Sequence, residues 1–74
     1  MGKTIYSKDH KFLIVQLKKA RIESRLDQKK VAELLGKTQS YISKIESGQR
    51  RVDVIQLKEF SRVYKKSLNF FIKK

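Results

Sequence analysis

Four polar side chains near the middle of the chain are spaced so that one face of a helix would present all of them: Gln39, Ser40, Ser43 and Lys44. Together they offer a carboxamide, two hydroxyls and an ammonium group. In the major groove of DNA, a Gln amide can bond adenine, a Lys can reach guanine, and a Ser can bond either base. A solvated face on an ordinary amphipathic helix has the same pattern, so periodicity alone leaves both interpretations open.

The net charge also favours a polyanionic partner. The 74 residues include 19 Lys and Arg against 7 Asp and Glu, which gives a formal net charge of +12. Nucleic acid is the first candidate for such a balance and an anionic membrane surface the second, although a merely soluble basic protein is also compatible with it. The excess is spread evenly along the chain, so composition does not indicate which face binds.

The remaining reactive residue types are too few for catalysis or metal binding. The chain has no Cys, which excludes disulfides, zinc fingers and thiol chemistry. Its single His, His10, has no cluster of carboxylates around it, and the acids include no pairing suited to general acid–base work. We therefore expect no enzymatic activity, no metal and no cofactor.

No stretch resembles a targeting signal or a membrane span, because the longest apolar run covers only residues 12–15. The expectation is a cytoplasmic protein, associated with the nucleoid if it binds DNA.

Hydrophobic periodicity and capping residues predict an all-α chain, a compact bundle of five helices. We expect an N-terminal extension over residues 1–9 and one domain over residues 10–74. The expected helices cover about 10–24, 28–35, 39 to about 46, a segment starting at 54, and a short segment from 68 to the end. The last four have good N-cap residues in Asp27, Thr38, Asp53 and Ser67.

Individual residues near the helix ends support several of these boundaries. Gly36 and Gly48 follow the second and third helices, where a left-handed conformation costs little only for Gly. Asp53 and Gln56 have the spacing of a capping box, and Val52 can pack on Leu57. The expected core is formed by the apolar positions Leu13, Leu17, Ala20, Val31, Ala32, Leu35, Ile42, Ile45, Leu57, Phe60, Tyr64, Leu68 and Phe71.

Two short helices joined by a tight turn with Gly are typical of a helix-turn-helix, here residues 28–35 and 39–46. This stretch resembles the Xre/Cro–repressor helix-turn-helix family, and the likeness extends from about Leu13 to Phe71. The residues that carry it are Gln28-x-x-x-Ala32-x-x-x-Gly36, then Thr38-Gln39-Ser40, then Ile42-Ser43-x-Ile45-Glu46-x-Gly48-x-Arg50. Many relatives have Pro where this chain has Val52, a departure that loosens the loop before the fourth helix.

The resemblance implies a lambda-repressor-like bundle that binds operator DNA as a two-fold dimer, with roles for particular residues. It assigns base reading to Gln39, Ser40, Ser43 and Lys44, and a buried ion pair to Arg21 and Glu46. It assigns contacts with the DNA backbone to Gln28, Arg50 and Arg51. To these we add Lys37, Thr38 and Tyr41, with the Tyr41 ring packed and its hydroxyl directed outward. The apolar C-terminal end suggests Phe70 and Ile72 as dimer contacts.

These observations together predict a sequence-specific regulator of transcription, a repressor that binds double-stranded DNA as a homodimer on a near-palindromic operator. The alternative is an antitoxin-like or adaptor protein that chiefly binds a protein partner, such as a toxin or an anti-repressor, and keeps DNA binding for autoregulation. A membrane-surface role for residues 70–74 is disfavoured by the well-capped interior helices. RNA binding is disfavoured because no aromatic stacking platform is visible.

Overall fold

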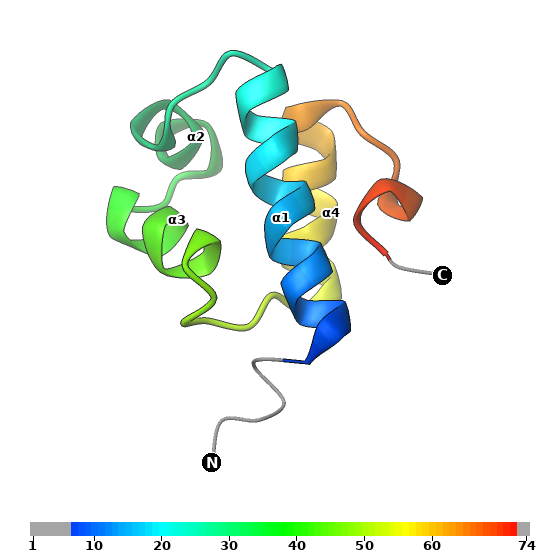
Figure 1. Cartoon of the computed structure of the whole chain (residues 1–74). Helices are drawn as coiled ribbons and strands as arrows, with labels where there is room; N and C mark the ends of the chain where they lie inside the picture. Colours follow the sequence, from blue (N-terminus) through cyan, green and yellow to red (C-terminus); the bar gives the residue numbers. More distant parts are fainter. Residues whose placement is uncertain (1–6, 73–74) are drawn as a thin grey trace.

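The computed structural model describes residues 7–72, which form four α-helices and one short 3-10 helix, with no strand in that range (Figure 1). The helices are α1 (Lys8–Glu23), α2 (Gln28–Leu35), α3 (Gln39–Glu46), α4 (Val54–Tyr64) and the 3-10 helix η2 (Leu68–Phe71). α1 and α4 lie side by side; α2 and α3 cover one side of this pair, and η2 covers the other (Figure 1). The prediction of an all-α bundle is confirmed for these residues.

Every helix contributes to a single apolar core, because each has an apolar stripe at helical spacing. The core is closed on the α3 side by Ile42 and Ile45 and on the C-terminal side by Phe71, all of which are fully buried. The buried hydrophobic residues of the described chain are Leu17, Ala20, Val31, Ala32, Tyr41, Ile42, Ile45, Leu57, Phe60, Tyr64 and Phe71. Leu13, Leu35, Val52 and Leu68 are partly buried against it.

The boundaries of α2 and α3 are those predicted, and side-chain caps account for them. Asp27 accepts a hydrogen bond from the Lys30 N–H at 2.7 Å, and Thr38 accepts one from the Tyr41 N–H at 3.1 Å. α4 begins after Asp53 with the expected capping box, formed by reciprocal bonds of 2.7 and 2.9 Å between Asp53 and Gln56. These caps satisfy N–H groups that have no partner inside their own helix.

α1 begins two residues earlier than predicted, at Lys8 rather than at His10, and ends at Glu23. Its N-cap is Ser7, whose hydroxyl accepts a hydrogen bond from the His10 N–H at 3.1 Å. Asp9 then lies in the first turn, where a negative charge is favourable. Residues 1–6 of the expected N-terminal extension lie outside the described residues.

The predicted fifth helix is wrong, because residues 68–71 form only one 3-10 turn. Ser67 makes no side-chain capping bond, and four residues are too few to propagate an α-helix without one. Tertiary contacts hold the turn instead: the Gln16 amide donates to the Phe70 carbonyl at 2.9 Å, and Phe71 enters the core. Ile72, predicted as a dimer contact, is extended and 51% exposed.

Candidate nucleic-acid interface

α2 and α3 are joined by a three-residue turn and pack directly on each other. Gly36 has φ 68°, the left-handed conformation that L side chains rarely adopt, and the next N–H, of Lys37, donates back to the Ala32 carbonyl at 2.8 Å. This turn redirects the chain so that α3 lies across the end of α2 with Ile42 and Ile45 facing the core. The geometry is that of a helix-turn-helix.

The side of α3 that faces away from the core carries the four predicted base-reading residues. Gln39, Ser40, Ser43 and Lys44 are all exposed, whereas the opposite side of the same helix is buried. The structure therefore brings the four side chains together on one accessible surface of a helix whose backbone is held by the core. This surface, which we call the reading face, can present donors and acceptors to a groove.

A polar hollow lies beside the reading face. It is bounded by the turn between α2 and α3, by three residues of α3, by Arg50 from the following loop and by Gln56 from α4. Three of its lining residues are cationic: Lys37, Lys44 and Arg50. Since these cations come from three different segments, the hollow suits an anionic group such as a phosphate.

Tyr41 forms part of the wall of this hollow, and one prediction made for it is wrong. Its side chain is buried, and its hydroxyl is enclosed with no hydrogen-bond partner instead of pointing outward. Burial raises the pKa of this hydroxyl above the ordinary value for Tyr, partly offset by the charge of Arg50. The ring contacts two cations, with the Lys37 ammonium 5.4 Å and the Arg50 guanidinium 4.9 Å from its centroid.

Arg21 and Glu46 form the ion pair that the resemblance implies, and Gln28 joins it. Arg21 Nε lies 2.7 Å from Glu46 Oε2, and Arg21 Nη2 lies 3.2 Å from Glu46 Oε1. The side-chain amide of Gln28 donates to the same Oε1 at 3.1 Å. This bond links the start of α2 to the end of α3. The hydrogen bond with Glu46 raises the pKa of Arg21, against the opposing effect of burial. The network links α1, α2 and α3 behind the reading face.

Tyr64 places a buried hydroxyl in the core that the sequence analysis missed, because its spacing identified it only as part of the apolar face of α4. Its side chain is almost fully buried and its hydroxyl has no hydrogen-bond partner. Burial raises the pKa of Tyr64 well above its ordinary value, and the negative charge of Glu46 adds to this effect. No sequence signal distinguishes a Tyr with an unpaired hydroxyl from a Phe at the same position.

Of the remaining predicted DNA-backbone residues, Thr38, Arg50 and Arg51 are exposed. The Thr38 hydroxyl accepts the capping bond of α3, which leaves its own proton available to donate. Gly48, with φ 82°, lets the chain turn after α3, and the Arg50 guanidinium then lies 4.9 Å from the centroid of the Tyr41 ring in α3. This position of Arg50 suits a contact with the DNA backbone at the edge of the reading face.

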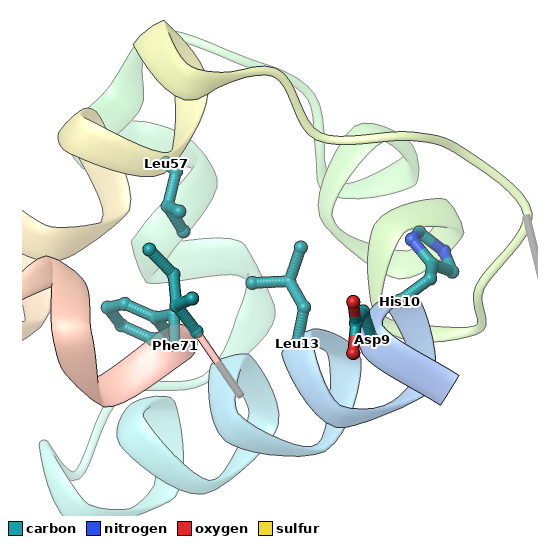
Figure 2. A pocket seen from close by; sticks show the side chains of 6 residues that line it. Asp9, His10, Leu13, Leu57 and Phe71 are labelled. Carbon is teal, nitrogen blue, oxygen red and sulfur yellow. The ribbon is translucent and has the colours of Figure 1, made fainter. Parts of the chain in front are cut away.

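The C-terminal residues proposed for dimer contacts differ from each other in accessibility. Phe70 is half-buried, with its ring edge-on to Phe71 at 5.2 Å and the Lys66 ammonium 4.8 Å above it. Ile72 is exposed and lies at the rim of an apolar pocket, into which Leu13, Leu57 and Phe71 point (Figure 2). Of the two, Ile72 is the one that presents apolar surface.

Among residues 7–72, no group of His, Cys, Asp and Glu is arranged to hold a metal ion. His10 is half-buried, and its Nε2 atom has no hydrogen-bond partner. No helix in the described part of the chain is long and apolar enough to cross a membrane.

Comparison with known families agrees with this geometry. A family model described as helix-turn-helix matches residues 17–71, which includes all of α2, α3, α4 and η2 and the C-terminal part of α1. No curated protein matches the sequence.

Proposed function

The chain belongs to the Xre/Cro-like helix-turn-helix family of DNA-binding regulators, and from that premise we propose that it is a sequence-specific repressor that acts as a homodimer. In this proposal α3 enters the major groove of double-stranded DNA. The proposed repressor acts by occupying its operator.

The observation that carries the proposal is the contrast between the two sides of α3. Gln39, Ser40, Ser43 and Lys44 are exposed together, while Ile42 and Ile45 are fully buried beneath them. A helix anchored in this way presents its polar side chains with little freedom of the backbone, which suits hydrogen bonding to fixed positions on base edges. Gln39 is the proposed adenine-reading residue and Lys44 the proposed guanine-reading residue.

Contacts with phosphates set the register of α3 in the groove and supply most of the salt-dependent affinity. The cationic hollow formed with Lys37 and Arg50 lies next to the reading face and is the proposed site of one phosphate. Arg51 and the Thr38 hydroxyl contact the same strand. Gln28 is the first residue of α2, so its backbone N–H has no partner inside the helix. In this proposal that N–H donates to a phosphate on the other side of the groove.

The size of the reading face supports the proposed homodimer. One helix of eight residues spans only a few base pairs, so two copies on one face of the duplex are needed for a selective site. The half-sites are then about one helical turn apart, ~34 Å. The apolar surface around Ile72, beside Phe70, is the proposed contact between the two copies.

Selection of bound fragments from a random duplex pool, followed by sequencing, tests this proposal. We expect an enriched near-palindromic motif with two half-sites about 10 base pairs apart from centre to centre. Enrichment of no motif, with equal binding to all duplexes, overturns sequence-specific recognition. A single asymmetric motif saturated by one copy overturns the homodimer. If a protein partner co-purifies and the selected DNA binds only to that complex, the adaptor alternative replaces the repressor.

A further inference from the structure

We propose that Tyr41 is a positioning residue for phosphate binding, whose ring holds the Lys37 and Arg50 side chains at the hollow beside α3. This inference rests on the proposed function, because the anion concerned is a phosphate of the bound duplex. Tyr41 itself donates nothing to the DNA, since its hydroxyl is enclosed.

The geometry that supports this role is the shared contact of two cations with one ring. The Lys37 ammonium lies over the Tyr41 ring at 5.4 Å from the centroid, and the Arg50 guanidinium lies at 4.9 Å. Both distances are within the range at which the ring attracts a cation. Lys37 belongs to the turn before α3 and Arg50 to the loop after it, so the ring connects the two segments that flank the reading face. Both cations and the ring line the same hollow.

Lys and Arg side chains have several rotatable bonds, and ordering them on a phosphate costs conformational entropy. The two cations also repel each other when they converge on one hollow. A ring that already holds both of them reduces both costs before DNA arrives, which is the general advantage of a preorganised site. Because Tyr41 is fixed in the core on the buried side of α3, the position of the two cations is coupled to the position of α3 itself.

The buried hydroxyl makes the ring, and not the phenol, the relevant part of Tyr41. A Phe at this position keeps the ring and removes a buried oxygen that has no hydrogen-bond partner. A Leu keeps an apolar side chain in the core but removes the ring. Comparison of the two variants therefore separates contact with the cations from filling of the core.

The experiment measures the affinity of the full chain for a selected duplex at one salt concentration. We expect Tyr41→Leu to weaken binding about tenfold, because the Lys37 and Arg50 side chains must then be ordered at the moment DNA binds. Tyr41→Phe should restore the affinity to within about twofold. In the background of Arg50→Ala the effect of Tyr41→Leu should fall to about threefold, since one of its two cations is gone. If Tyr41→Leu lowers the affinity by the same factor in the wild type and in the Arg50→Ala background, the proposal is overturned.

Phe60→Leu is the matched control for loss of a buried ring, because Phe60 is buried in the same core but stacks on Tyr64 and does not line the hollow. It should lower the melting temperature and leave the affinity of the folded protein unchanged. If Phe60→Leu weakens binding as much as Tyr41→Leu, the effect is one of stability and the proposal is wrong.

A measurement without DNA keeps the inference testable if Tyr41→Leu does not fold. Protons of the Lys37 and Arg50 side chains that lie over the ring should be shifted upfield in proton NMR spectra of the wild type and of Tyr41→Phe. Side-chain shifts at random-coil values for both residues overturn the positioning role. If these shifts are present but the wild type binds no duplex, the proposed function fails and the geometry stands.

Discussion

Arg21 and Glu46 are joined at two points, with Arg21 Nε 2.7 Å from Glu46 Oε2 and Arg21 Nη2 3.2 Å from Glu46 Oε1. The Arg21 side chain is 14% exposed and that of Glu46 only 5%. The pair therefore connects the last turn of α1 to the last residue of α3. Its Glu46 Oε1 atom also accepts a bond from Gln28, so three helices meet at one carboxylate.

Removal of one partner of this ion pair should lower the stability of the fold. Glu46→Ala leaves the Arg21 charge in a poorly solvated position and also frees the Gln28 amide, so we expect a loss of up to about 3 kcal/mol in the free energy of unfolding. Binding to DNA should weaken as well, because the end of α3 loses its attachment. Denaturant unfolding checks the stability, and a duplex titration checks the binding.

The double variant Arg21→Met, Glu46→Leu is the control for this prediction. Replacement of a buried ion pair by apolar groups is often close to neutral, so much of the lost stability should return. A double-mutant cycle that shows no coupling energy between positions 21 and 46 would contradict the structural role of the pair.

Arg50→Ala should weaken binding to all duplexes by a similar factor. Arg50 contacts the phosphate backbone in this account, so its loss should reduce the slope of log affinity against log salt by about 0.9, the value for one contact. Titrations at several salt concentrations, on the selected site and on random DNA, measure this slope. An unchanged slope would place Arg50 away from the phosphates.

Tyr64→Phe should change the dependence of stability on pH. Burial raises the pKa of Tyr64, so the folded protein keeps this proton at a pH where the unfolded chain, with a Tyr pKa of about 10, has lost it. Ionisation then favours the unfolded state, and the contribution of Tyr64 is intact below about pH 10 and is lost as the pH rises further. The free energy of unfolding then falls by up to about 1.4 kcal/mol per pH unit. Tyr64→Phe removes this pH dependence.

Unfolding free energies of wild type and Tyr64→Phe, measured from pH 8 to 11, check this prediction. Near neutral pH the variant should be at least as stable as the wild type, because it removes a buried hydroxyl without a hydrogen-bond partner. A difference between the two proteins that stays constant up to pH 11 would show that Tyr64 is solvated in the folded state.

Much of this architecture is encoded in short-range signals and could be predicted. The limits of α2 and α3 depend on Asp27, Thr38 and Gly36, each of which acts within four residues of its own position. The reading face could be predicted for the same reason, because helical periodicity alone places Gln39 and Lys44 on the side opposite Ile45.

The errors concern features that depend on distant parts of the chain. The C-terminal turn is held by Gln16 and by the insertion of Phe71, so local sequence cannot distinguish a 3-10 turn from a fifth helix. The direction of the Tyr41 hydroxyl depends on the surrounding core. The hydrogen bond between Gln28 and Glu46 joins residues that are 18 positions apart and belong to different helices, so local sequence does not indicate it.

The dimer surface can be tested at Ile72, which is 51% exposed. Ile72→Lys should weaken self-association, since it places two charges in an apolar contact, and should leave the fold intact because the side chain is outside the core. Sedimentation equilibrium over a range of protein concentrations measures this effect. A dimer of unchanged strength would exclude Ile72 from the interface.

Base reading by α3 distinguishes a sequence-specific regulator from a general DNA-binding protein, and the affinity of Gln39→Ala for two duplexes measures it. On the selected site we expect a loss of about 1–3 kcal/mol, the value of one bidentate contact with a base. On random DNA, where affinity comes from phosphate contacts, the variant should bind like the wild type. Equal losses on the two duplexes would contradict the account, because Gln39 would then contact the backbone and not the bases.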